Sequence, residues 1–204
     1  GKGVLSFDAV VMDEAAQAVE PSSLVPFKFN PRAIVMVGDP AQLTATLFSR
    51  EATDAQYGQS LFQRLQRGGH PKMMLDTQYR MHPRIAAFAS ERFYSGQLRS
   101  AEIVTEESHS QRFHCHPSFG PYLFHNVPDG RLKRNGTSLS NAEEGHYIVE
   151  MIKDLMFSFS DIDFSGRVGI IAPYRNQISL LRGLIKCTGL QRVEISTVDG
   201  FQGR

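Results

Sequence analysis

Two adjacent carboxylates, Asp13 and Glu14, directly follow the apolar residues 10–12. A buried strand that ends in two acids can hold a metal ion and a water molecule beside a phosphate. In such a site Asp13 would hold a magnesium ion, and Glu14 would orient and deprotonate the attacking water. The alternative is a helix N-terminus, where acids interact favourably with the helix dipole by about 0.3–1 kcal/mol. Taken alone, the pair leaves both interpretations open.

A second apolar run, residues 33–37, ends on Gly38 and Asp39 and is followed by Gln42. A glutamine in this place can hydrogen-bond a terminal phosphate and the attacking water, which makes it a candidate sensor. The Gly-Asp-Pro sequence would also form an ordinary tight turn. Since ligands of open parallel sheets bind at the carboxyl ends of the strands, we expect both polar groups along one rim.

Two further segments carry side chains suited to a nucleotide. Residues 78–83, Gln-Tyr-Arg-Met-His-Pro, present Arg80, which could donate to phosphate oxygens in a forked arrangement, and Tyr79, which offers a flat face. An arginine in an ion pair at a domain interface is the structural alternative. At residues 195–204 a predicted strand gives way to a turn containing glycine, with hydroxyl and amide groups that could contact a sugar-phosphate backbone.

The elements that position these residues alternate between strands and helices, which predicts α/β architecture with a parallel sheet. Several strands are apolar throughout, as strands covered on both faces should be. Residues 99–118 and 128–139 are expected to be irregular loops. Strands are predicted near 7–13, 33–38, 72–77, 121–127, 167–172 and 193–198, and helices over 58–67, 83–93, about 140–156 and 174–187. The helix at 83–93 is expected to present Ile85, Phe88 and Ala89 on one face, and the helix at 174–187 an apolar period of Ile178, Leu181, Leu184 and Ile185. Asn135-Gly136 is expected to form a turn.

The overall composition narrows the class of protein to which the chain can belong. The 204 residues are 41% hydrophobic and 21% charged with a net charge of +1, so overall charge does not point to nucleic acid. Residues 62–99 are locally basic, which fits either a phosphate track or a solvated face. Two cysteines, Cys115 and Cys187, argue against a disulfide framework and fit a reducing compartment. No apolar run approaches the roughly 20 residues needed to span a bilayer.

Together the four segments resemble the superfamily-one helicases of the up-frameshift and senataxin-like group. The motifs at 13–17, 38–43, 78–83 and 198–204 occur in the family's order and approximate spacing, and the resemblance covers essentially the whole chain. It implies a RecA-like P-loop NTPase helicase core with parallel sheets flanked by helices. Residues 1–69 would be the C-terminal part of a first RecA-like domain, and residues 70–204 a second one, truncated at its C-terminal end.

The resemblance also implies a role for each matching residue. The catalytic group would comprise Asp13 as magnesium ligand, Glu14 as hydrolytic base, Gln42 as γ-phosphate sensor and Arg80 as arginine finger. Nucleotide-binding positions would be Gln17, Gly38, Asp39, Tyr79 and Gly203, and nucleic-acid positions Arg175, Gln177, Thr197, Gly200 and Gln202.

The implied activity is ATP-driven translocation, 5′ to 3′, along single-stranded RNA or DNA, with unwinding of the nucleic acid. The implied cofactors are ATP and Mg²⁺. The resemblance also implies a protein of the nucleus or cytoplasm that has no membrane partner. The family's phosphate-binding loop, Gly-x-x-x-x-Gly-Lys-Ser/Thr, does not occur in the sequence. We therefore expect this segment alone to bind ATP poorly and hydrolyse essentially none. The alternative is a non-catalytic, helicase-like nucleic-acid-binding or scaffold module. A choice between RNA and DNA depends on contacts with the 2′-hydroxyl, which the motifs do not reveal.

Overall fold

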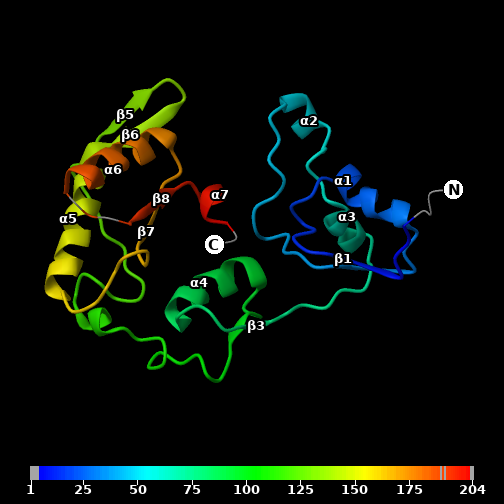
Figure 1. Ribbon diagram of the computed structural model, residues 1–204, viewed down its shortest axis with the longest axis horizontal. Helices are drawn as coiled ribbons and strands as arrows, with labels where there is room; N and C mark the ends of the chain where they lie inside the picture. The colour runs from blue at the N-terminus through cyan, green and yellow to red at the C-terminus, as the bar shows by residue number, and fades with distance from the viewer. Residues whose placement is uncertain (1–4, 189, 191, 203–204) are drawn as a thin grey trace. The chain divides into compact units, whose positions relative to one another are not determined.

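The computed structural model describes residues 5–188, 190 and 192–202. The chain divides into two compact units, one ending at Leu75 and the other beginning at Asp76 (Figure 1). The sequence places the boundary slightly earlier, after Gly69, in a Gly-Gly-His-Pro segment that interrupts both helix and strand. Among the described residues, no helix combines the length and apolar content needed to cross a membrane.

The first unit is organised by two parallel strands, β1 (Ala9–Met12) and β2 (Ala33–Met36), paired in register from Ala9 opposite Ala33 to Met12 opposite Met36. Both strands and their parallel direction agree with the prediction. The expectation of cover on both faces is wrong for this pair, because Val11 is 69% and Val35 53% exposed. The helices are α1 (Glu20–Leu24), the 3₁₀ helix η1 (Val25–Phe29), α2 (Arg50–Asp54) and α3 (Leu61–Arg67).

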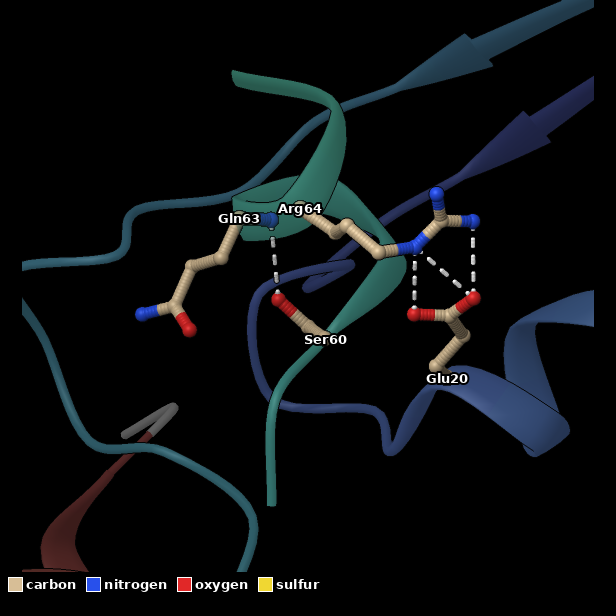
Figure 2. Close-up of polar contacts among 4 residues, drawn as sticks. All are labelled: Glu20, Ser60, Gln63 and Arg64. Atoms are coloured by element: carbon tan, nitrogen blue, oxygen red, sulfur yellow. Dashed lines mark hydrogen bonds and ion pairs between the residues drawn. The ribbon is translucent and has the colours of Figure 1, made fainter. Parts of the chain in front are cut away.

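Polar side chains link α3 to α1, as Figure 2 shows. Ser60 is fully buried and caps α3 by accepting a hydrogen bond of 3.1 Å from the backbone N–H of Gln63. Arg64 donates from Nε to both carboxylate oxygens of Glu20, at 2.9 and 2.8 Å. These bonds hold the pKa of Glu20 below its ordinary value. The helix that follows the two acids is therefore tied to α3 by a long-range charge pair.

The second unit combines short parallel strand pairs with longer helices. Strand β3 (Thr77–Gln78) pairs in parallel with β4 (Arg99–Ser100), and β7 (Gly169–Ile171) with β8 (Glu194–Ser196). Strands β5 (Leu132–Asn135) and β6 (Ser138–Asn141) form an antiparallel hairpin. The helical elements are α4 (Pro83–Tyr94), the 3₁₀ helix η2 (Arg112–Cys115), α5 (Ala142–Ser158), α6 (Arg175–Thr188) and α7 (Val198–Phe201).

The core of the second unit lies between α5, α6 and the β7–β8 pair. The apolar period predicted for α6 is confirmed, since Ile178, Leu181 and Ile185 are all buried there. Helix α5 approaches α6 closely at Gly145, where an added Cβ would lie 2.4 Å from Cδ2 of Leu180. The other buried members of this core are Val149, Ile152, Ile170, Ala172 and Ile195.

Several predicted elements are wrong. Residues 121–127 form no strand, and of residues 72–77 only Thr77 belongs to one. Residues 128–139 are not irregular, because they contain β5 and the start of β6, joined at Gly136 with its positive φ of 60°. Helix α4 does not bury its predicted face. Ile85 and Phe88 are exposed, and the small Ala86 and Ser90 point inward instead.

Candidate functional site

The β1–β2 pairing brings the first two polar motifs together. Beyond the paired residues, the N–H of Val37 donates to the carbonyl of Met12 at 2.8 Å, and the N–H of Ala15 donates to the carbonyl of Val37 at 2.8 Å. The loop that carries Asp13 and Glu14 therefore runs beside the loop that begins at Gly38. The prediction that both groups leave one rim of a parallel sheet is confirmed by this register.

Gly38 is where the two loops come closest. A Cβ at this position would lie 2.7 Å from the backbone nitrogen of Ala16 and 3.1 Å from that of Ala15. Both distances are to backbone atoms, which cannot rotate away as a flexible side chain would. Only glycine allows this separation, so the structure gives Gly38 a packing role between the two motifs.

The acidic loop is held in an uncommon backbone conformation. Glu14 has a positive φ of 50°, which costs a residue with a side chain roughly 1–2 kcal/mol. Its N–H donates to Oδ1 of Asp13 at 2.9 Å, and its carboxylate accepts from Nε2 of Gln17 at 2.7 Å. Residues 13–17 form turns and α1 begins only at Glu20, so the helix N-terminus alternative for the acids is wrong.

Some residues of the acidic loop are buried and others are exposed to solvent. Ala15 and Ala16 are 1% and 2% exposed, whereas Asp13 and Glu14 are exposed to solvent. The two alanines therefore anchor the turn while both carboxylates remain accessible. Two exposed carboxylates on a fixed backbone, one oriented by a neighbouring amide, can bind a hard cation and orient a water molecule.

Asp39 organises the neighbouring loop. Its Oδ1 accepts from the N–H of Ala41 at 2.9 Å, and its Oδ2 accepts from Nε2 of Gln42 at 2.9 Å. The tight-turn interpretation of Gly-Asp-Pro is therefore correct as a description of the backbone. The same carboxylate also fixes the direction of the exposed Gln42 amide, which leaves the carbonyl oxygen of that amide free of Asp39.

In the second unit, Tyr79 and Arg80 project from the segment between β3 and α4. Tyr79 is 65% exposed and Arg80 is exposed as well. Within the described residues no ion pair involves Arg80. The buried His82 caps α4, accepting from the N–H of Arg84 at 3.1 Å, and Pro83 occupies the first helical position.

The motif near the end of the chain forms a one-turn helix instead of the predicted turn. Thr197 caps α7 by accepting at Oγ1 from the N–H of Gly200 at 3.2 Å. A Cβ on Gly200 would lie 2.0 Å from Oγ of Ser196, so a larger residue here would require that hydroxyl to rotate away. Nε2 of Gln202 is buried and has no hydrogen-bond partner among the described residues, while Gly203 lies outside them.

The two predicted residues on α6 differ sharply. Arg175 is exposed at the first position of the helix. Gln177 is only 7% exposed, and its amide accepts from the N–H of Asn141 at 2.7 Å and donates to the carbonyl of Asn141 at 3.1 Å. A nucleic-acid contact by this amide would require both bonds to break. The structure thus gives Gln177 a role in joining α6 to β6, which sequence reasoning missed.

Comparison with known proteins identifies the family. Two models described as AAA domain match residues 2–50 and 57–204. Helicase sen1 of Schizosaccharomyces pombe is 39% identical over 98% of the chain, a probable helicase of Dictyostelium discoideum 43% over 97%, and probable helicase senataxin of Mus musculus 32% over 100%. The chain spans 12%, 20% and 8% of these relatives' lengths. It belongs to the AAA domain family and, within it, to the superfamily-one helicases related to Sen1 and senataxin.

Proposed function

We propose that the full-length protein is an ATP-driven helicase that moves 5′ to 3′ along single-stranded RNA or DNA and unwinds it. The observation that carries the proposal is the shared rim of β1 and β2, where Asp13 and Glu14 lie beside the loop of Gln42. The relatives named as helicases support the same activity. Hydrolysis of a terminal phosphate needs a cation site, a water-orienting group and a sensor, and this rim presents all three side-chain types.

Asp13 is suited to hold Mg²⁺. Its carboxylate is exposed, and one of its oxygens already accepts the N–H of Glu14, which fixes the direction of the other. Magnesium prefers oxygen ligands and is commonly bound through one or two carboxylates together with substrate phosphates. When bound, the ion would neutralise charge on the phosphate oxygens.

Glu14 is the proposed base, and Gln17 and Asp39 are proposed to position the reacting groups. The hydrogen bond from Gln17 reaches Oε2 of Glu14 and leaves Oε1 to accept a proton from water. On the adjacent loop, Asp39 holds the amide nitrogen of Gln42. The carbonyl oxygen of Gln42 can then accept from the attacking water, as a sensor of the terminal phosphate requires.

Residues 1–69 and 70–204 are proposed to be parts of two consecutive RecA-like domains, which the division of the chain after Leu75 supports. Arg80 would then act as an arginine finger on the nucleotide held by the first domain, with Tyr79 near its base or ribose. The exposure of both side chains supports these roles. Thr197, Gly200 and Gln202 would link nucleotide and nucleic acid, Gly203 would contact the nucleotide, and Arg175 would contact the strand.

Steady-state ATPase measurements on the full-length protein test the proposal, with single-stranded RNA and single-stranded DNA in parallel. Replacing Glu14 by Gln should lower stimulated turnover by about 10²–10⁴-fold and spare ATP binding, as expected for loss of a general base. Glu106→Gln is a matched control, because Glu106 is an exposed glutamate in the second unit. Undiminished turnover in Glu14→Gln would reject the assigned base. Nucleic-acid binding without any wild-type ATPase would favour the non-catalytic scaffold.

A further inference from the structure

One side chain holds the backbone of the segment that carries Arg80. Oε1 of Gln78 accepts from the N–H of Arg80 at 2.9 Å and from the N–H of Met81 at 2.7 Å. Nε2 of Gln78 donates to the carbonyl of Met81 at 2.9 Å and to Oγ of Ser100 at 2.8 Å. A side-chain amide offers two donor hydrogens and two acceptor lone pairs, and here all four positions are used.

Gln78 is itself fixed by the strand pair. It lies opposite Ser100 in the parallel β3–β4 register, and its carbonyl accepts from the N–H of Ala101 at 3.0 Å. One residue pair earlier, Arg99 binds Asp76 through both backbone and side chain. That guanidinium holds the pKa of Asp76 below its usual value, so the carboxylate stays charged over a wide range of pH. The amide therefore projects from a framework that is bonded on both sides.

Between β3 and α4, the side chain of Gln78 is fully hydrogen-bonded, whereas the side chain of Arg80 is exposed. The amide of Gln78 is half-buried and saturated, so it has no polar atom left for a nucleotide. Arg80 has the opposite character, with a bonded backbone N–H and an exposed side chain. On the far side, His82 caps α4. The segment is thus fixed at both ends, and only the side chains of residues 79 and 80 extend into solvent.

We propose that Gln78 is a positioning residue for Arg80, acting by fixing the backbone from which the guanidinium extends. The inference rests on the proposed function, in which that guanidinium acts on the phosphates. Catalytic geometry is sensitive to displacements of about 1 Å, which can lower rates by about 10²-fold. Loss of the amide would leave the N–H groups of Arg80 and Met81 and the carbonyl of Met81 without this partner. The backbone at Arg80 would then no longer be fixed in a single position.

The first test is ATPase of the full-length protein carrying Gln78→Ala, with Gln97→Ala as the control, because Gln97 is an exposed glutamine just beyond α4. We expect kcat to fall by roughly 10- to 100-fold with little change in KM for ATP. Gln78→Glu retains the acceptor oxygen but sets an oxygen against the carbonyl of Met81, so its kcat should fall as well. Ser100→Ala removes one of the four bonds and should lower kcat by about fivefold.

A double-mutant cycle separates positioning from general stability. If Gln78 acts through Arg80, adding Gln78→Ala to Arg80→Ala should lower kcat by no more than about twofold further. A full additional loss in the double variant would overturn the inference. Melting temperatures are measured in parallel, and if Gln78→Ala does not fold, the same cycle is run with Ser100→Ala.

The two proposals fail in different ways. Arg80→Ala with normal ATPase would reject the finger role, and with it the proposed function of this segment. Arg80→Ala with a large loss but Gln78→Ala with normal kcat would reject the positioning role alone. A Gln78→Ala variant that loses ATP affinity while kcat holds would also contradict it, because the amide would then act on binding.

Discussion

Replacing Gly38 by alanine should separate the two loops that carry the proposed catalytic groups. The added Cβ would lie 2.7 Å from the backbone nitrogen of Ala16 and 3.1 Å from that of Ala15. Ordinary contact requires a movement of about 0.7 Å, since non-bonded heavy atoms are comfortable only beyond roughly 3.4 Å. Both alanines are buried and closely packed. A shift of their backbone would therefore lengthen the hydrogen bond from the N–H of Ala15 to the carbonyl of Val37.

The magnitude follows from this geometry. Overpacking at a buried contact costs roughly 1–3 kcal/mol of stability. Moving Asp13 and Glu14 relative to Gln42 by a large part of an ångström should lower ATP turnover by roughly 10- to 100-fold. Chemical denaturation measures the first quantity and steady-state ATPase of the full-length protein the second.

The control is Gly183→Ala, which should have the opposite sign. Gly183 lies inside α6, and an added Cβ there meets no atom within 4 Å. Alanine is the better helix former by roughly 0.5–1 kcal/mol, so this variant should be more stable and equally active. If Gly38→Ala kept full stability and turnover while Gly183→Ala behaved as expected, the close approach at Gly38 would not be what holds the two loops in place.

Three further outcomes are expected. Ser60→Ala should lower the free energy of unfolding by about 1 kcal/mol, measured by urea denaturation, because it removes the cap of α3; no loss would contradict the capping role. Asp39→Ala should lower ATP turnover by roughly 10-fold, because Gln42 loses its orienting partner, and unchanged turnover would exclude that role. Burial and the neighbouring His82 lower the pKa of His114 from 6.5, so the folded state binds fewer protons than the unfolded state. The contribution of His114 to the free energy of unfolding should therefore be complete above about pH 6.5 and should be lost as the pH falls below it. Melting temperatures measured against pH should fall less steeply for His114→Asn than for the wild type, and equal slopes would refute this.

Local signals predicted much of the framework correctly. The apolar runs before Asp13 and Gly38 marked two strands whose ends lie together, because parallel pairing brings carboxyl ends to the same edge. The period of α6 predicted its buried face, since a 3.6-residue repeat depends only on the helix itself. The Asn-Gly sequence before Thr137 indicated a turn, and β5 and β6 are joined there.

The rest depended on contacts that a linear pattern does not contain. Apart from Leu132 and Leu139, the β5–β6 hairpin is built from polar residues, so hydrophobic periodicity could not detect it. On the buried face of α4, Ser90 donates a hydrogen bond to the carbonyl of Leu98, and an apolar period does not report such a contact. The same holds for Gln177, whose partner Asn141 lies 36 residues away in the sequence.

The affinity of the full-length protein for ADP with aluminium fluoride and magnesium, a mimic of the transferring phosphate, tests our proposal that the acids of the first unit and Arg80 of the second act on one nucleotide. Arg80→Ala should weaken this complex on the order of 10³-fold while ADP affinity changes little, and the exposed Arg84→Ala control should change neither. Equal losses for ADP and the mimic, or no loss for either, would contradict the claim.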